Sequence, residues 1–305
     1  MQAVTLDTIT KTYGKEKKLA VDNVSFSVNK GELFGLIGAD GAGKTSIFRI
    51  LTTLLLPDNG TATVDGLDTV KDYKQIRRNV GYMPGKFSLY QDLSVEENLN
   101  FFATVFGTTI KENYHLIKDI YVQIEPFKNR RAGKLSGGMK QKLALCCALI
   151  HKPSVLFLDE PTTGVDPVSR KEFWEMLKRL KQQNITIVVS TPYMDEASLC
   201  DRIALIQTGK ILSIDTPENI IAAYPEKLYK IKADNMFGLL KDLNKISNTL
   251  SCYTFGEYLH LSLTSDEEQD KIALLDHLKN KAHQNIQMAV ITPTIEDCFI
   301  KLLKN

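Results

Sequence analysis

The chain has 305 residues, which is enough for one large or two modest domains. Its 38 lysine and arginine residues nearly balance 36 acidic residues, so the net charge of +2 gives no reason to expect nucleic acid as a partner. No uncharged apolar run approaches the roughly 18–20 residues that cross a bilayer, and the N-terminus lacks the basic and then apolar pattern of a secretion signal. We therefore expect a cytoplasmic protein that serves a membrane only through a partner, with its five scattered cysteines as buried, reduced thiols.

The first predicted elements are edge strands. Residues 3–30 alternate between apolar and polar side chains, as half-buried strands do. Tyr13 is expected to be exposed, and its ring either packs on the surface or forms a platform for an adenine base.

A phosphate-binding loop follows. The run that matches the pattern G-x-x-x-x-G-K-[ST] is Gly38-Ala39-Asp40-Gly41-Ala42-Gly43-Lys44-Thr45. It lies between a predicted buried strand at 32–37 and a predicted amphipathic helix at 45–51, which is the context that a P-loop needs. Its glycines allow backbone N–H groups to face phosphates at a helix N-terminus. Lys44 is then expected to reach the β- and γ-phosphates, and the Thr45 hydroxyl to ligate Mg²⁺.

The next stretch interrupts this alternation of strands and helices. Short strands are predicted at 61–64 and 80–83, and Ser94 with Glu97 forms a capping box that begins a helix. Residues 94–134 are mainly helical in pattern, so we expect a helical insertion that extends through the following helix, about 94–150.

The start of that following helix is a second candidate anion site. In Leu135-Ser136-Gly137-Gly138-Met139, Ser136 can cap a helix over 139–150, and the two glycines expose backbone N–H groups at its positive end. A plain helix cap with flexible glycines remains the alternative interpretation of the motif taken alone.

Two carboxylates end the next predicted strand. The run Ser154-Val155-Leu156-Phe157-Leu158-Asp159-Glu160 is apolar up to its end, as a parallel strand buried on both faces must be. Acids at the carboxyl end of such a strand lie where open α/β sheets bind ligands. We expect Asp159 to hold Mg²⁺ through water and Glu160 to polarise an attacking water.

Residues 161–214 complete the α/β region. Asp166 and Pro167 predict the start of a helix that reaches about residue 182, with Trp174 on its core-facing side. A central strand follows at 185–190, and a hairpin follows at 202–214.

From residue 225 the pattern becomes β-α-β-β-α-β with a final helix near 294–299, which predicts a small split-βαβ domain. Its three histidines are scattered, so we expect them to be packed or solvated.

The order of these motifs resembles that of the ATP-binding-cassette (ABC) transporter ATPase. The resemblance covers about residues 3–222 and rests on the P-loop, the Leu-Ser-Gly-Gly signature, the Asp159-Glu160 pair and Asp166 in their family order. Met139 and the tail Thr292-Pro293-Thr294-Ile295-Glu296-Asp297-Cys298-Phe299 look like the ABC-2 type, drug-efflux branch. The implied fold is an α/β P-loop NTPase at 1–222, with a parallel-sheet core, an antiparallel edge subdomain and a helical insertion, followed by an α+β accessory domain at 225–305.

The resemblance also implies a mechanism. Cassettes of this family pair head to tail, so ATP would lie between residues 38–46 of one chain, including Ser46, and Leu135 to Gly138 of the other. Tyr13 matches the adenine-stacking aromatic, Glu160 the catalytic carboxylate, and Asp166 the dimer-contacting D-loop. Residues 85–97 would contact ABC-2 type permease subunits at the inner face of the cytoplasmic membrane.

Two positions depart from the family pattern. Gly85 stands where the family has a glutamine, and Pro192 stands where it has a histidine, so neither can sense the γ-phosphate through a polar side chain. Asp40 and Lys142 are milder departures from asparagine and arginine.

These departures predict a division of labour. We expect the chain's own site to bind ATP but hydrolyse it slowly, while its signature completes the site of a second, different cassette. A homodimer that relies on Glu160 alone is the alternative partner arrangement. The alternative functions are a soluble ABC ATPase without a transport role and a nucleotide-gated regulator without turnover.

Overall fold

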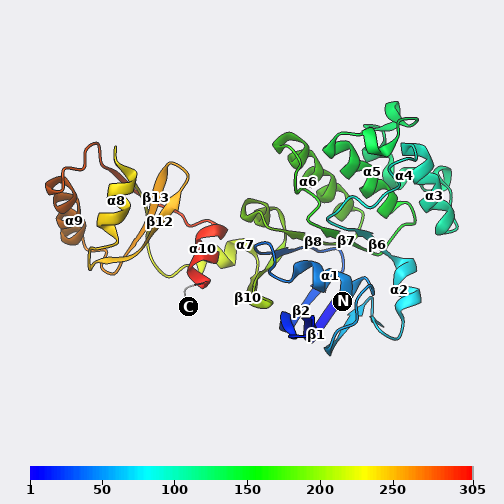
Figure 1. Cartoon of the computed structure of the whole chain (residues 1–305), viewed down its shortest axis with the longest axis horizontal. Helices are drawn as coiled ribbons and strands as arrows, with labels where there is room; N and C mark the ends of the chain where they lie inside the picture. Colours follow the sequence, from blue (N-terminus) through cyan, green and yellow to red (C-terminus); the bar gives the residue numbers. More distant parts are fainter. Residues whose placement is uncertain (304–305) are drawn as a thin grey trace. The chain divides into compact units, whose positions relative to one another are not determined.

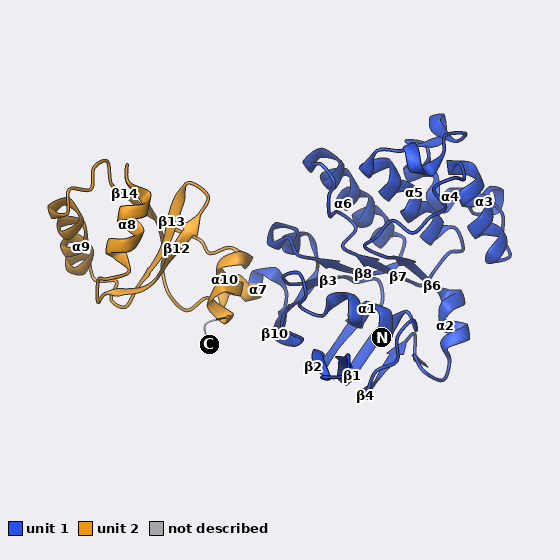
Figure 2. Cartoon of the chain, in the orientation of Figure 1, with its two compact units in different colours: residues 1–218 blue, residues 219–305 orange. Residues whose placement is uncertain are grey.

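The computed structural model describes residues 1–303 and divides into two compact units, 1–218 and 219–305 (Figure 2). The division lies a few residues before the boundary expected at 222–225. The last two residues of the expected accessory domain, 304 and 305, lie outside the described residues.

The first unit is built on a six-stranded sheet (Figure 1). Its strand order is β10-β9-β3-β8-β7-β6, and the five strands from β9 to β6 run parallel. The bounds are β3 Leu33–Ile37, β6 Val80–Met83, β7 Val155–Asp159, β8 Thr186–Thr191, β9 Arg202–Gln207 and β10 Lys210–Asp215. Every residue of β3, β7 and β8 is buried, as a parallel strand covered on both faces requires.

A second, antiparallel sheet packs beside it. Its strand order is β2-β1-β4-β5, with bounds β1 Gln2–Tyr13, β2 Lys18–Asn29, β4 Asn59–Val64 and β5 Leu67–Asp68. Helix α1, Lys44–Leu51, lies in one continuous apolar core with this sheet and with β3, β7 and β8. Helix α2, Tyr73–Asn79, leads into β6. The parallel core and the antiparallel edge subdomain therefore confirm the predicted fold class.

The helical insertion stands on the opposite side of the central sheet from α1 (Figure 1). It contains α3 Val95–Val105, α4 Ile110–Tyr121, the 3-10 helices η1 Glu125–Phe127 and η2 Ala132–Lys134, and α5 Gly137–Leu149. Ser94 and Glu97 form the predicted capping box. Helix α6, Pro167–Gln182, begins at the predicted cap Asp166 and buries Trp174 in the core.

The 3-10 helix η3, Met194–Leu199, follows β8, and α7, Pro217–Ala222, spans the division between the units. The second unit has the predicted β-α-β-β-α-β order. Its elements are β11 Leu228–Lys232, α8 Met236–Leu243, β12 Thr249–Phe255, β13 Tyr258–Leu263, α9 Glu268–Asn280, β14 Gln287–Ile291 and α10 Ile295–Leu302. Its sheet order is β12-β13-β11-β14 with every pair antiparallel, which is the split-βαβ arrangement.

Two sequence expectations concern membrane-spanning segments and cysteines. None of the helices within residues 1–303 is both long enough and apolar enough to cross a membrane. All five cysteines are reduced thiols, but Cys252 in β12 is half-buried, so the expectation of burial is wrong at that position.

Candidate active site

Two glycines allow the P-loop backbone to pack closely against neighbouring strands. Gly38 follows β3, and a Cβ there would lie 2.1 Å from the Ile206 carbonyl oxygen of β9. Gly43 has φ +105°, and a Cβ there would lie 2.3 Å from the Ala20 carbonyl oxygen of β2. Side chains are excluded at both positions, because the loop backbone packs directly against β9 and β2. This geometry fits the phosphates of a nucleotide.

Lys44 begins α1 with its ammonium group buried inside the loop. Its Nζ donates to the Gly38 carbonyl at 2.7 Å and to the Ala39 carbonyl at 3.1 Å. The same Nζ lies 3.1 Å from Glu160 Oε1. Asp40 is exposed, so its extra negative charge points away from the loop interior.

The two carboxylates at the end of β7 have different surroundings. Asp159 is almost fully buried and accepts a hydrogen bond from the Ser190 hydroxyl of β8 at 2.6 Å. Glu160 has left the strand with φ +51°, and its N–H donates to the Ser190 carbonyl at 3.0 Å. A left-handed conformation is uncommon outside glycine and turns the Glu160 side chain toward Lys44.

Tyr82 in β6 adds an aromatic ring beside this pair. Burial raises the pKa of Tyr82 to about 12, and the negative charge of Asp159 adds to the shift. The hydroxyl therefore stays protonated at physiological pH.

Tyr13 reaches the same end of α1 from β1. Its hydroxyl lies 3.0 Å from Ser46 Oγ, while the residue keeps two-fifths of its surface exposed. Residues 1–303 contain no cluster of three or more His, Cys, Asp or Glu side chains arranged to hold a metal. A divalent cation would need phosphate and hydroxyl oxygens, and half-buried Thr45 in α1 offers one hydroxyl.

Both departures from the family pattern lie at this site. A Cβ at Gly85 would lie 3.1 Å from the Asp159 carbonyl oxygen and 3.8 Å from Glu160 Cβ, so position 85 borders the carboxylate pair. Pro192 follows β8 directly, and η3 begins two residues later, at Met194. Since the Tyr193 N–H donates to the Thr191 hydroxyl at 3.1 Å, residues 191–193 form a tight turn before η3.

The signature motif forms a separate group on the other side of the sheet. Exposed Ser136 caps α5 by accepting from the Met139 N–H at 3.4 Å, while Leu135 is buried. A Cβ at Gly138 would lie 2.8 Å from Ser169 Oγ of α6, so α5 and α6 approach closely there. Gly137 lies beside the Gly164 carbonyl of the turn that leads into α6.

Asp166 ends this turn and caps α6. It accepts a hydrogen bond from the Ser169 N–H at 3.0 Å, and this bond lowers the pKa of Asp166. Lys142 of α5 pairs with Glu172 of α6 at 2.8 Å, so the milder departure at 142 has a structural partner.

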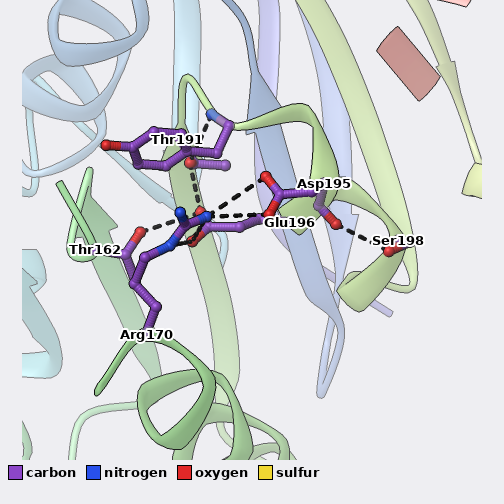
Figure 3. Close-up of polar contacts among 7 residues, drawn as sticks. Thr162, Arg170, Thr191, Asp195, Glu196 and Ser198 are labelled. Atoms are coloured by element: carbon purple, nitrogen blue, oxygen red, sulfur yellow. Dashed lines mark hydrogen bonds and ion pairs between the residues drawn. The ribbon is translucent and has the colours of Figure 1, made fainter. Parts of the chain in front are cut away.

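The predicted residues therefore form two groups. One contains the P-loop, Tyr13, Asp159, Glu160 and Gly85, and the other contains the signature and Asp166. Sequence reasoning missed Ser190, which donates to Asp159. It also missed Arg170 and Glu196, which contact each other (Figure 3). The spacing of apolar residues identifies strands and helices, but it does not show which polar residue becomes buried. No sequence pattern therefore identified these three residues.

Known proteins show the same organisation. Residues 21–163 match a family model described as ABC transporter. The chain is 37% identical, over 98% of its length, to the probable multidrug ABC transporter ATP-binding protein YbhF of Escherichia coli (strain K12), of which it spans 52%. It is 32% identical, over 98% of its length and 96% of the relative, to the Nod factor export ATP-binding protein I of Rhizobium sp. (strain N33).

A solved structure agrees with these relatives. The dimeric post-hydrolysis state of the ATP-binding cassette MJ0796 bound to ADP and Pi superposes with a TM-score of 0.64 at 26% identity, covering 70% of this chain and 98% of that one. The chain spans about half the length of the first multidrug relative and nearly the whole of the Nod factor relative. The relatives bear out the predicted resemblance to the drug-efflux branch. The chain belongs to the ABC transporter family, as an ATP-binding cassette.

Proposed function

We propose that the chain is the ATP-hydrolysing subunit of an ABC-type exporter, in which ATP closes a pair of cassettes and thereby drives membrane subunits. The observation that carries this proposal is the 3.1 Å contact between Lys44 Nζ and Glu160 Oε1, which brings a phosphate-binding group and a water-activating group together. The names of the relatives, one multidrug and one Nod factor export protein, support export.

The chain's own residues would divide the work on ATP. Residues 38–46 would bind the triphosphate through backbone N–H groups, and Lys44 would exchange its carbonyl partners for the β- and γ-phosphates. Glu160 would accept a proton from the attacking water, and the ring of Tyr13 would stack on adenine.

A magnesium ion fits the same residues. The Thr45 hydroxyl would ligate it directly and Asp159 through water, and Ser190 orients that carboxylate by donating at 2.6 Å. When bound, the ion neutralises negative charge on the phosphates.

Hydrolysis at this site would be slow. Position 85, beside Asp159 and Glu160, carries no side chain, and position 192 carries no donor or acceptor. Preorganised donors at such positions are worth a few kcal/mol of transition-state stabilisation. The site would therefore retain nucleotide, and a second cassette of different sequence would supply the faster site.

The signature would act on that second cassette. Ser136 and Asp166 are exposed, and Ser136 with Gly137 and Gly138 presents N–H groups at the N-terminus of the 13-residue helix α5. Such a terminus attracts a γ-phosphate that a partner cassette brings to it.

The permease would dock beside β6. A pocket of about 200 Å³ there is lined by side chains of β6, α3 and α5 together with Leu89, Phe106 and His151. It adjoins residues 85–97, and its mostly apolar lining, which also includes Arg77, suits one or two side chains of a short amphipathic helix of a membrane subunit. This docking would place the cassette at the inner face of the cytoplasmic membrane.

The test is steady-state phosphate release by the full chain alone, with a co-expressed ABC-2 type permease, and with a second cassette. We expect ATP binding by the chain alone, low turnover, and high turnover with the second cassette. Rapid turnover by the chain alone that is lost in Glu160→Gln would contradict the division of labour. Failure to co-purify with any permease would favour the soluble ATPase, and complete absence of turnover in every assembly would favour the regulator.

A further inference from the structure

One buried carboxylate joins three segments that border the candidate active site. Glu196 lies in η3 and is almost completely buried. Its Oε2 accepts from the Thr191 hydroxyl at 2.5 Å and from the Thr162 hydroxyl at 3.1 Å, and its Oε1 contacts Arg170 Nε at 3.2 Å and Nη2 at 3.1 Å (Figure 3). We call Glu196, Arg170, Thr191 and Thr162 the Glu196 cluster.

Each partner belongs to a different segment. Thr162 lies two residues after Glu160, in the turn that leads to Asp166. Arg170 lies in the first turns of α6, four residues after Asp166. Thr191 is the last residue of β8 and directly precedes Pro192.

Thr191 also bonds the P-loop. Its carbonyl accepts from the N–H of Gly38, the first P-loop glycine, at 3.2 Å, and its hydroxyl also accepts from the Tyr193 N–H. The neighbouring Ser190 bonds both Asp159 and the Glu160 N–H. A change in the position of α6 would therefore reach the P-loop and the carboxylate pair through the end of β8.

Electrostatics make the cluster rigid. An unpaired buried carboxylate is strongly unfavourable, so Glu196 must keep its cation and its two hydroxyl donors together. Arg170 is held from a second side, because its guanidinium stacks 4.2 Å from the Tyr193 ring centroid. Asp195 also contacts Arg170 Nη2, at 3.2 Å, but this carboxylate is mostly exposed and contributes little.

We propose that Glu196 is a positioning residue that couples the Asp166 turn and α6 to the P-loop. This inference rests on the proposed function, since the coupled step is ATP hydrolysis in a cassette pair. A partner that presses on Asp166 moves α6, and the Glu196 cluster passes this displacement to Thr191 and thus to Gly38. The cluster does not touch nucleotide, so it governs turnover and not ATP affinity.

The experiment compares variants of the full chain paired with a second cassette whose own catalytic carboxylate is replaced by glutamine, so that turnover reports the site on this chain's P-loop. Glu196→Gln, Arg170→Gln and the near-isosteric Thr191→Val are each expected to lower kcat by on the order of tenfold to a hundredfold. The dissociation constant for ATP should stay within about threefold, and Glu196→Gln/Arg170→Gln should be no slower than the worse single variant, because coupled residues are not additive. Asp195→Asn is the matched control, since it removes the exposed ion pair of the same guanidinium, and it should keep kcat within about twofold.

Three results would overturn the inference. They are an unchanged kcat in Glu196→Gln, additive losses of kcat in the double variant, or a loss of turnover that is explained by weaker ATP binding. Thr191→Val guards against misfolding as the cause, because it keeps the shape of the side chain and removes only the hydroxyl. If the unsubstituted protein never turns over ATP, the proposed function fails, and amide hydrogen exchange then decides the inference. Exchange at Tyr193 should accelerate in Glu196→Gln and not in Asp195→Asn, and equal exchange in both variants would contradict the coupling.

Discussion

In the proposed mechanism, the residues at positions 85 and 192 limit the rate of ATP hydrolysis. Gly85 borders the Asp159 carbonyl and the Glu160 side chain, so a side chain at position 85 would lie beside the proposed catalytic carboxylate. Pro192 stands in the turn between β8 and η3, where its ring can neither donate nor accept a hydrogen bond. We therefore attribute the proposed slow hydrolysis to the residues at these two positions and not to the fold.

Introducing the glutamine and the histidine of the family pattern should therefore raise turnover. In Gly85→Gln/Pro192→His the isolated chain is expected to release phosphate at least about tenfold faster, because each polar group adds transition-state stabilisation. A Cβ at position 85 would be 3.1 Å from the Asp159 carbonyl oxygen, so a shift of a few tenths of an ångström is needed to admit the glutamine side chain. Steady-state phosphate release measures the gain, and adding Glu160→Gln should abolish it. Unchanged turnover with normal ATP binding would refute the assignment of these positions.

Two P-loop glycines offer a matched pair for testing the phosphate cradle. Both have positive φ, but a Cβ at Gly43 would collide with the Ala20 carbonyl at 2.3 Å, whereas a Cβ at Gly41 meets nothing within 4 Å. Gly43→Ala should lose at least about 2 kcal/mol of unfolding free energy and most ATP binding. Gly41→Ala should lose only about 1 kcal/mol, from backbone strain. Chemical denaturation and nucleotide titration would show the difference, and equal losses would contradict the collision.

At the scale of elements, a buried carboxylate ties α10 to the sheet of the second unit. Asp297 Oδ1 accepts from the Tyr253 hydroxyl at 2.7 Å and contacts His260 Nδ1 at 2.6 Å, while Oδ2 accepts from the Thr294 N–H at 2.7 Å. The aspartate thus caps its own helix and ties it to β12 and β13. Burial by itself would raise the pKa of Asp297, but the hydrogen bonds from Thr294, Tyr253 and His260 outweigh it and lower the pKa from its ordinary value of 3.8.

Asp297→Asn should destabilise the second unit by about 1–3 kcal/mol at pH 7, since it weakens bonds to a charged acceptor. A lowered native pKa means that the charge stabilises the fold fully above the unfolded value near 3.8. That stabilisation is lost as pH falls through the lower native pKa. The difference in denaturation midpoint between the two proteins should therefore narrow below about pH 4. A difference that is constant down to about pH 2 would show that the carboxylate charge plays no part.

At the scale of the whole molecule, two separate apolar cores suggest two folding transitions. One core joins the sheets of the first unit around α1, and the other lies between the helices and the sheet of the second unit. The nucleotide residues all belong to the first unit, so a ligand can stabilise only that core directly.

Calorimetry should therefore resolve two transitions, of which magnesium and ATP shift one. At ATP concentrations about a hundredfold above Kd the gain for residues 1–218 is about 2.7 kcal/mol. Lys44→Ala should remove the shift and leave the other transition unchanged. A single transition that moves as a whole would show that the units unfold together.

The sequence alone predicted the elements that carry periodic or punctuated patterns. The buried strands, the caps at Ser94, Ser136 and Asp166, and the split-βαβ order follow from local chemistry and are found as expected. What it missed are polar residues whose partners are distant in the chain. Glu196 lies in a segment whose polar residues usually meet solvent, and only the approach of α6 and β8 makes it a buried acceptor.

The position of Tyr13 has a consequence for which nucleobase the site accepts. Its hydroxyl is fixed to Ser46, so a base can meet only the ring face, and stacking on a face does not read the hydrogen-bonding edge of a base. Discrimination between purines would then be weak, and the phosphates would supply most of the affinity. We expect GTP to compete with ATP within about tenfold in affinity, and Tyr13→Ala to weaken both nucleotides equally in a competition titration.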